Sequence, residues 1–244
     1  MSEPRYPVAI LAGGTATRLR PLTETVPKSL IEVNGEPFIA HQLRLLCRNG
    51  FEHVVVCAGH LGEMTRAFVK DGAEFGLRVD FSFDGPSLLG TAGALKKALP
   101  LLGAAFFVLY GDSYLLCDYR AVQEAFAKRS SEGLMTVFRN EDRWDRSNVE
   151  FSDGRIVAYD KVRRTSRMRH LDYGLGILRP SALDAVPVDL PRDLAEVYRS
   201  LLEREELIGF EVTQRFYEIG SFEGLEETRA FLGTSRAPER SLAE

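Results

Sequence analysis

Residues 7–30, PVAILAGGTATRLRPLTETVPKSL, decide the fold of this chain. The segment passes directly from an apolar strand candidate, PVAILA, into a glycine loop. In α/β proteins, ligands bind beside the loops that follow the carboxyl ends of parallel strands. We therefore predict a parallel strand that ends near Ala12 and a ligand site in the loop after it.

The following residues alternate short apolar runs with amphipathic stretches. Further strand candidates are HVVVCAG, LRVDFSF and AAFFVLYGD, and helix candidates are IAHQLRLLCRNG, a stretch through Phe68, and TAGALKKAL. Strands that alternate with helices indicate a mainly parallel sheet covered by helices on both faces. Gly50 follows the first of these helices, as expected of a helix C-terminus.

The second half of the chain has a different pattern. NVEFSDGRIVAYDK reads as two strands around an Asp153-Gly154 turn, which is a hairpin signal. Ser221 can cap a helix over FEGLEETRAFLG, with Glu223 in its first turn. We predict one Rossmann-like α/β domain over residues 1–233, with antiparallel additions in its second half, and a tail over 234–244 that frays.

Composition excludes several classes of protein. The chain has 244 residues, of which 45% are hydrophobic and 27% charged, and its net charge is −4, as expected of a soluble globular protein. It has no basic stripe of the kind that binds duplex nucleic acid, and no apolar run near the roughly 20 residues that span a membrane. We expect a cytoplasmic protein in which Cys47, Cys57 and Cys117 are buried free thiols.

The glycine loop combines exposed backbone amides with cations. Gly13 and Gly14 permit positive φ and place no Cβ in the way of an anion, although a tight turn alone would also explain them. Arg18 and Lys28 add fixed positive charge that suits a polyphosphate. The spacing fits neither a Walker A loop nor the dinucleotide fingerprint.

LAGGTATRLRPLT with Pro27-Lys28 resembles the signature of the sugar-1-phosphate nucleotidylyltransferase family, and the resemblance runs from Val8 to about Leu232. It implies a reaction between a nucleoside triphosphate and a sugar 1-phosphate, with Mg²⁺ as cofactor. It also implies that the loop amides and Arg18 hold the triphosphate, and that Lys28 neutralises charge near the reacting phosphate. The implied nucleotide-binding residues are Leu11, Ala12, Gly13, Gly14, Thr15, Arg18, Lys28, Gly90, Thr91, Gly111 and Asp112.

Position 16 departs from the pattern of the family, which usually has glycine where this chain has Ala16. Alanine is strained wherever the backbone needs a positive φ. The departure leaves the role of the loop in place and predicts strain at Ala16 if that residue has a positive φ.

Two further segments resemble the nucleobase and metal motifs of the family. In LLGTAGALKKAL, Gly90 to Gly93 are expected to line the nucleobase and sugar pocket, although small residues also suit a helix N-terminus. Asp112 in YGDSY and Glu218 in YEIGS are expected to share Mg²⁺, although Asp112 alone reads as a turn residue. Most relatives have aspartate where this chain has Glu218.

The sugar side is implied by IVAYDK and HLDYGLGIL. Lys161 is expected to hold the attacking phosphate and therefore joins Arg18 and Lys28 as a catalytic residue. The other implied contacts to the sugar phosphate are Gly93, Asp160, Asp172, Tyr173 and Gly174, and Tyr173 suits the core equally well. The arginine-rich stretch 163–169 is either a solvated loop or a lid near a second phosphate or an acidic sugar.

Among the groups of this family, the motifs look most like heptose 1-phosphate guanylyltransferases, which implies GTP and a heptose 1-phosphate. Alternatives are UTP with N-acetylmuramate or hexose 1-phosphate, CTP with a phospho-alcohol, and a non-catalytic subunit that binds nucleotide sugars. The sequence leaves open whether the chain forms a homo-oligomer.

Overall fold

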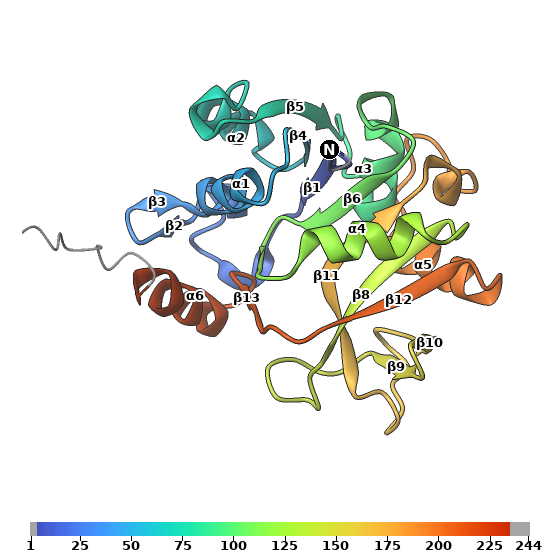
Figure 1. Cartoon of the computed structure of the whole chain (residues 1–244). Helices are drawn as coiled ribbons and strands as arrows, with labels where there is room; N and C mark the ends of the chain where they lie inside the picture. Colours follow the sequence, from blue (N-terminus) through green and yellow to red (C-terminus); the bar gives the residue numbers. More distant parts are fainter. Residues whose placement is uncertain (1–3, 235–244) are drawn as a thin grey trace, which may run out of the picture.

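The computed structural model describes residues 4–234 and contains one large mixed sheet (Figure 1). The strands of this sheet are β1 (Val8–Ala12), β4 (His53–Ala58), β5 (Arg78–Phe83), β6 (Phe106–Tyr110), β8 (Gly133–Arg139), β9 (Val149–Ser152), β10 (Arg155–Tyr159), β11 (His170–Leu178) and β12 (Leu207–Val212). Their order is β10-β9-β11-β6-β1-β4-β5, and β8 pairs with both β11 and β12.

The first half of the chain forms the parallel part of the sheet. β6, β1, β4 and β5 all run parallel, with Val8 beside both Val54 and Phe107. Val8, Ala9 and Ile10 are all fully buried, because helices cover both faces of these strands. The predicted parallel sheet, with a glycine loop after its first strand, is confirmed.

The second half adds antiparallel strands, as predicted. β11 runs antiparallel to β6 and β8, whereas β12 runs parallel to β8. β9 and β10 form the predicted hairpin. Asp153 and Gly154 at its turn have φ of 52° and 74°, the positive values that a two-residue hairpin loop needs.

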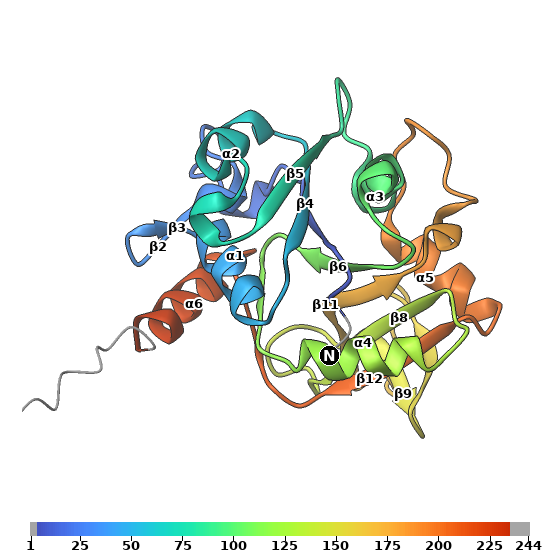
Figure 2. The same cartoon turned by 45° about the horizontal axis from the view of Figure 1, so that its top comes forward.

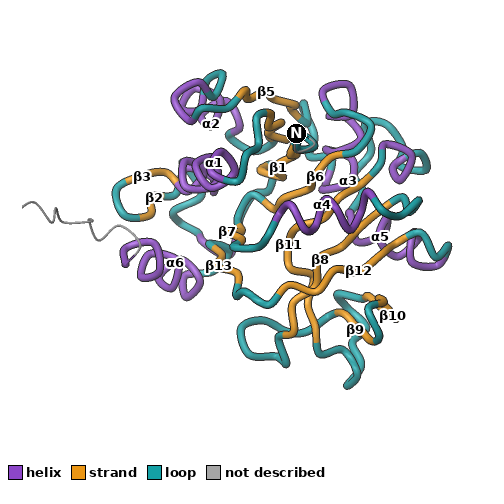
Figure 3. Tube along the Cα trace, viewed as in Figure 1, coloured by secondary structure: helices purple, strands orange, loops and turns teal. Residues whose placement is uncertain are grey.

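Helices cover the two faces of the sheet as separate layers (Figure 2). One face packs against α1 (Phe38–Arg48), α2 (Gly62–Val69) and α4 (Tyr119–Ala127). The other face packs against α3 (Gly90–Ala98) and α5 (Leu194–Glu203). Short 3-10 turns occupy Thr17–Leu19, Lys28–Leu30, Ala73–Phe75, Leu99–Leu101 and Pro180–Leu183 (Figure 3).

A third, smaller core joins the N-terminal loop to the end of the described chain. It lies between α6 (Phe222–Thr234), the pair β2 (Glu32–Val33) and β3 (Glu36–Pro37), and the pair β7 (Ser113–Leu115) and β13 (Phe216–Glu218). The Ser221 hydroxyl accepts a hydrogen bond from the Gly224 amide at 3.0 Å, so the predicted helix cap is confirmed. Thr234 of the predicted tail is the last residue of α6, and the rest of that tail lies outside the described residues.

The structure bears on two predictions from composition, one about the cysteines and one about membrane-spanning helices. Cys57 is buried, but Cys47 and Cys117 are partly exposed, so the prediction of three buried thiols is wrong for two of them. Both lie at the edge of the core, where solvent still reaches the side chain. Within residues 4–234, no helix combines the length and the apolar composition needed to cross a membrane.

Candidate active site

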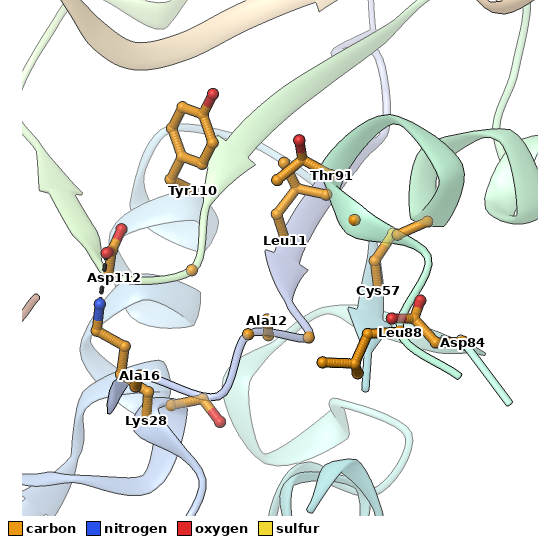
Figure 4. A pocket seen from close by; sticks show the side chains of 16 residues that line it. Leu11, Ala12, Ala16, Lys28, Cys57, Asp84, Leu88, Thr91, Tyr110 and Asp112 are labelled. Carbon is orange, nitrogen blue, oxygen red and sulfur yellow. Dashed lines mark hydrogen bonds and ion pairs between the residues drawn. The ribbon is translucent and has the colours of Figure 1, made fainter. Parts of the chain in front are cut away.

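A pocket of about 220 Å³ opens at the carboxyl edge of the parallel strands (Figure 4). The loops after β1, β5 and β6 meet there with the start of α3. The lining residues are Leu11, Ala12, Gly13, Gly14, Ala16, Lys28, Ser29, Cys57, Asp84, Leu88, Gly90, Thr91, Ala94, Tyr110, Gly111 and Asp112. All the predicted nucleotide-binding residues except Thr15 and Arg18 belong to this lining.

Close backbone approach explains the glycines of the pocket. A Cβ on Gly13 would lie 3.3 Å from both Asp84 Oδ2 and the Gly59 amide nitrogen, and one on Gly111 would lie 2.5 Å from the Leu11 carbonyl oxygen. A Cβ on Gly59 would lie 2.6 Å from the Gly13 carbonyl oxygen. Glycine therefore lets the ends of three neighbouring strands converge.

The left-handed position of the loop is Ala16 and not one of its glycines. Gly13 and Gly14 are not among the described residues with positive φ, whereas Ala16 has φ 47° and ψ 46°. Gly13 and Gly14 permit a positive φ but do not adopt one, and the left-handed turn lies at Ala16. The expected strain at position 16 is present, since an L-residue with a Cβ disfavours this region.

An ion pair closes one side of the pocket. Lys28 Nζ lies 2.6 Å from Asp112 Oδ2, and Figure 4 shows the two side chains pointing toward one another. Burial by itself would raise the pKa of Asp112, but the Lys28 ammonium and hydrogen bonds from Lys28 and Ser113 outweigh burial and lower that pKa. Asp112 is therefore an ionised carboxylate across the physiological range.

Two more charged side chains, Glu218 and Arg18, lie close to Lys28 around the backbone of Gly220. A Cβ built on Gly220 would lie 2.5 Å from Glu218 Oε2, 3.1 Å from Lys28 Nζ and 3.2 Å from Arg18 Nη2. β13 pairs with β7, and the Ile219 amide donates to the Asp112 carbonyl at 2.9 Å. Arg18 and Glu218, from segments two hundred residues apart, therefore lie around Gly220 beside Lys28 and Asp112 of the pocket lining.

The donor chemistry of this edge fits a divalent metal that arrives with its substrate. Asp112 and Glu218 offer hard carboxylate oxygens, which Mg²⁺ prefers, and Mg²⁺ usually takes only one or two carboxylates beside water and phosphate oxygens. Among the described residues, no group of three or more His, Cys, Asp or Glu side chains could hold a metal by itself. The site thus fits a metal that phosphates help to bind.

Only part of the segment Gly90 to Gly93, which was expected to line the nucleobase and sugar pocket, belongs to the lining. The Thr91 hydroxyl accepts a hydrogen bond from the Leu194 amide at 2.7 Å and so holds the first turn of α5. A Cβ on Gly93 would lie 2.9 Å from the Leu190 carbonyl oxygen, and Gly93 is outside the pocket lining. Gly93 therefore has a packing role in this structure, whereas Gly90 and Thr91 border the pocket.

The residues predicted for the sugar gather beside the pocket. Lys161 Nζ lies 5.5 Å from the centre of the Tyr110 ring and 4.0 Å from Asp193 Oδ1. Asp172 accepts hydrogen bonds from the Gly174 amide at 3.1 Å and from the Tyr159 hydroxyl at 3.3 Å. Burial raises the pKa of Asp172, and the nearby Lys161 ammonium opposes this shift.

Two predicted sugar contacts have structural roles, and for Tyr173 this is the core position that the sequence also allowed. The Tyr173 side chain is 2% exposed and packs against Phe138 and Phe216 in the core, so its ring does not border the pocket. Asp160 accepts hydrogen bonds from the Val162 and Arg163 amides and thereby shapes the loop after β10. These hydrogen bonds lower the pKa of Asp160.

The arginine-rich stretch is exposed and pairs locally. The Arg164 guanidinium donates to the Lys161 carbonyl at 3.3 Å, and Arg167 lies 3.2 Å from Glu150. The Arg167–Glu150 contact ties the stretch to β9, and none of its arginines lines the pocket.

Asp84 and Tyr110 are among the pocket side chains that sequence reasoning missed. Asp84 is 5% exposed, accepts a hydrogen bond from the Leu89 amide at 3.1 Å, and has a pKa that burial raises. Both residues follow the pattern already used for Asp112, because Asp84 comes directly after β5 and Tyr110 is the last residue of β6. That rule, applied to every strand, would have found them.

Several known proteins are similar to this chain in sequence or in fold. Residues 8–149 match the profile of the nucleotidyl transferase family. Mannose-1-phosphate guanyltransferase of Debaryomyces hansenii is 31% identical over 235 residues, which are 86% of this chain and 60% of that protein. The chain therefore spans less than two thirds of the length of this relative.

A second relative matches over nearly its whole length. N-acetylmuramate alpha-1-phosphate uridylyltransferase of Neisseria meningitidis serogroup B is 30% identical over 227 residues, which are 92% of this chain and 97% of that protein. Among solved structures, HddC from Yersinia pseudotuberculosis with GMP-PN superposes with a TM-score of 0.75 at 21% identity, covering 93% of this chain and 99% of HddC. At this level of identity, the structural likeness shows the fold alone.

Proposed function

Because the chain belongs to the sugar-1-phosphate nucleotidylyltransferase family, we propose that it transfers a nucleoside monophosphate from a triphosphate to a sugar 1-phosphate and releases pyrophosphate. The observation that carries this proposal is the convergence of Arg18, Lys28, Asp112 and Glu218 beside the glycine loop. Such a set can neutralise a triphosphate and hold the metal that accompanies it.

In the proposed reaction, a phosphate oxygen of the sugar 1-phosphate attacks the α-phosphorus in line. The bond from that phosphorus to the bridging oxygen breaks, and pyrophosphate leaves with the electron pair. The attacking phosphate is already ionised, so the protein supplies no general base. Lys161 holds the attacking phosphate, and Arg18 with Lys28 offsets the charge that develops on the leaving group.

Asp112 and Glu218 would hold Mg²⁺, which supplies charge neutralisation on the phosphates when bound. Lys28 pairs with Asp112 at 2.6 Å in the free protein. We propose that the Lys28 ammonium exchanges this partner for the phosphates when the triphosphate binds, and that Asp112 is thereby freed.

For the base we propose guanine, on the strength of Asp84. Its buried carboxylate lies against Gly13 inside the pocket, and within residues 4–234 the Leu89 amide is the only group that donates to it. A carboxylate recognises edges that present hydrogen-bond donors, and guanine offers two neighbouring donors, N1–H and the N2 amino group. Uracil and cytosine offer one donor group each on the corresponding edge.

For the sugar we propose a heptose 1-phosphate, which the motifs YGDSY, YDK and DYGLGIL support by resemblance. The second candidate is UTP with N-acetylmuramate 1-phosphate, because the uridylyltransferase relative matches over 97% of its length. Asp193 and the buried Asp172 both lie near Lys161 and would repel a carboxylate on the sugar. This charge pattern favours the neutral sugar.

The test is pyrophosphate release by the purified protein with Mg²⁺, with each of the four ribonucleoside triphosphates against a panel of sugar 1-phosphates that includes a heptose. We expect release with GTP and a neutral sugar. Release with UTP and N-acetylmuramate 1-phosphate would establish the second candidate instead. Nucleotide binding without release by any pair would contradict catalysis and favour a nucleotide-sugar-binding subunit.

Asp84→Asn tests the choice of base separately. The amide keeps an oxygen acceptor for the Leu89 amide but turns one acceptor toward the base into a donor. We expect kcat/KM for GTP to fall at least about tenfold relative to UTP, the discrimination that one good base contact gives. An unchanged ratio would remove Asp84 from base recognition.

A further inference from the structure

Gln42 is a polar side chain on the buried side of α1. It is 1% exposed, and the other buried residues of this helix are apolar except His41. A polar group that leaves water needs hydrogen bonds, because an unpaired one is costly to bury. The partners of Gln42 therefore indicate why glutamine occupies this position.

The Gln42 amide binds both sides of the turn that carries Asp112. Gln42 Nε2 donates to the Tyr110 carbonyl at 3.2 Å and to the Ser113 carbonyl at 2.8 Å. A primary amide has two N–H donors, and these two hydrogen bonds use both. Because Asp112 lies between the two carbonyls in the sequence, one side chain fixes the backbone before and after the carboxylate.

The other polar atom of this side chain, Gln42 Oε1, is buried, and no group within residues 4–234 donates to it. Turning the amide over would bring Oε1 against the two carbonyl oxygens, so the turn itself fixes the orientation of the amide. A buried acceptor without a donor lowers stability. Gln42 thus holds the turn at a cost to the fold, which points to a functional reason for it.

The remaining backbone groups of the turn are held by other segments. The Gly111 amide donates to the Leu11 carbonyl at 3.0 Å, and the Asp112 carbonyl accepts from the Ile219 amide at 2.9 Å. Both of these partners follow or belong to strands that contribute residues to the proposed site. No residue of α1 lines the pocket, so Gln42 acts on the site only through the backbone of the turn.

We infer that Gln42 is a positioning residue for the Asp112 carboxylate. It fixes the turn over residues 110–113, and thereby the direction in which Asp112 faces Lys28 and the metal that accompanies the triphosphate. Removing a side chain that orients a metal ligand typically costs about 10–100-fold in metal affinity or activity. This inference rests on the proposed function, in which Asp112 holds Mg²⁺, and extends it to a residue outside the pocket and outside the motifs that resemble the family.

Gln42→Met tests this inference, because it removes both donors at nearly unchanged side-chain volume. Wild type and variant are compared by pyrophosphate release at varied Mg²⁺ and, separately, at varied sugar 1-phosphate. We expect kcat to fall about 10–100-fold and the Mg²⁺ concentration for half-maximal turnover to rise. KM for the sugar 1-phosphate should stay unchanged, because the turn does not carry Lys161.

Binding gives a second readout that does not depend on turnover. Calorimetry measures the Kd of the triphosphate that wild type turns over, with Mg²⁺ and with EDTA, in the absence of the sugar 1-phosphate. We expect Mg²⁺ to strengthen binding to wild type, and this gain to be about tenfold smaller in Gln42→Met. The Kd with EDTA should be the same for both proteins.

Gln123→Met is the matched control. Gln123 is a buried glutamine of α4 that also makes two hydrogen bonds to the backbone, from the Tyr6 amide and to the Pro4 carbonyl, both at 3.0 Å. Its replacement should lower the Tm by about 4–8 °C, as for the loss of two hydrogen bonds, and leave kcat and the Mg²⁺ dependence unchanged. Gln42→Met should lower the Tm by no more than this, because it also removes the unpaired Oε1. Gln42→Asn, which keeps the amide but shortens its reach, gives the same comparison should Gln42→Met not fold.

The outcomes separate the two levels of the account. Wild-type turnover, with the kcat and Mg²⁺ dependence of the Gln42 variant equal to those of Gln123→Met, would overturn this inference and leave the proposed function intact. A change confined to KM for the sugar 1-phosphate would also overturn it, because Gln42 would then act on the sugar side. Absence of wild-type turnover with every pair of substrates would contradict the proposed function and this inference together.

Discussion

At the scale of single residues, Ala16 has the left-handed backbone conformation that glycine adopts most easily, although its side chain is a methyl group. It has a left-handed backbone, held by hydrogen bonds to its carbonyl from the Leu19 amide at 3.0 Å and the Thr23 hydroxyl at 2.9 Å. These contacts come from the loop that positions Arg18. The loop therefore imposes its geometry on alanine, although glycine would adopt it with less strain.

Ala16→Gly should increase the free energy of unfolding by about 1 kcal/mol, because it removes the left-handed strain. The Tm should rise by about 2–4 °C. Ala125→Gly, within α4, is the control and should be destabilising by about 1 kcal/mol, since helical alanine is favourable. Equal destabilisation in both variants would show that Ala16 carries no strain.

The buried carboxyl of Asp84 makes a pH-dependent contribution. Burial raises its pKa above 3.8, the value of the unfolded chain, so the folded protein binds this proton more tightly than the unfolded one. The contribution of Asp84 to stability is therefore largest at low pH and falls as pH rises through the raised pKa. At neutral pH, the folded protein holds an ionised carboxylate in a site that disfavours it.

Asp84→Asn should therefore be more stable than wild type at pH 7, and this difference should shrink toward pH 4. The measurement is the free energy of unfolding in urea for both proteins at the two pH values. A variant that is less stable than wild type at pH 7 would mean that the carboxylate stabilises the fold and is not held there for ligand binding.

At the scale of elements, the segment before α5 sits directly on α3. The Ala92 amide donates to the Arg192 carbonyl at 2.9 Å, and the Thr91 hydroxyl accepts from the Leu194 amide. A Cβ on Gly90 would lie 2.5 Å from the Arg192 carbonyl oxygen. Small residues at the start of α3 therefore serve contact with a segment one hundred residues away as well as the pocket.

Thr91→Val should lower the free energy of unfolding by about 1 kcal/mol, because it leaves the Leu194 amide at the start of α5 without its acceptor. Thr91→Ser keeps the hydroxyl and should recover most of this loss. Chemical denaturation of the three proteins checks the prediction. Equal stability of Thr91→Val and wild type would show that this hydrogen bond contributes nothing.

Local sequence patterns predicted the elements well but not every side chain. Apolar periodicity and turn residues identified the parallel strands, α1, α3, the hairpin at Asp153 and the cap at Ser221, because short-range propensities decide these features. The roles of Thr91 and Gly93 depend on contacts with distant segments, and so does the choice between pocket and core that the sequence left open for Tyr173. Such contacts leave no periodic signal in the sequence.

At the scale of the whole molecule, the site joins both ends of the domain. Arg18 and Lys28 come from the first thirty residues, whereas Glu218 and Gly220 come from β13 and the turn before α6. Sequence motifs implied that Asp112 and Glu218 share a metal, and the pairing of β13 with β7 brings their backbones together. The convergence on Gly220 was not predicted, because it depends on how α6 packs against the N-terminal loop.

A ligand that bridges these segments should stabilise the whole domain. At GTP one hundredfold above its Kd, with Mg²⁺, the gain is about 2.7 kcal/mol, which corresponds to a rise in Tm of about 5–10 °C. UTP and CTP at the same concentration should give smaller rises. Equal shifts with all triphosphates, measured by calorimetry, would contradict recognition of guanine.

The most direct test of nucleotidyl transfer at this pocket is the turnover of Arg18→Ala and Asp112→Ala with the substrate pair that the screen identifies. Pyrophosphate release and the mass of the nucleotide sugar are followed together, and Arg20→Ala, which removes an exposed arginine of the same loop, is the control. We predict a loss of at least about a hundredfold in both site variants, as for removal of one transition-state contact, and near-normal turnover in the control. Near-normal turnover in Arg18→Ala and Asp112→Ala would contradict the account, because the chemistry would then lie elsewhere in the protein.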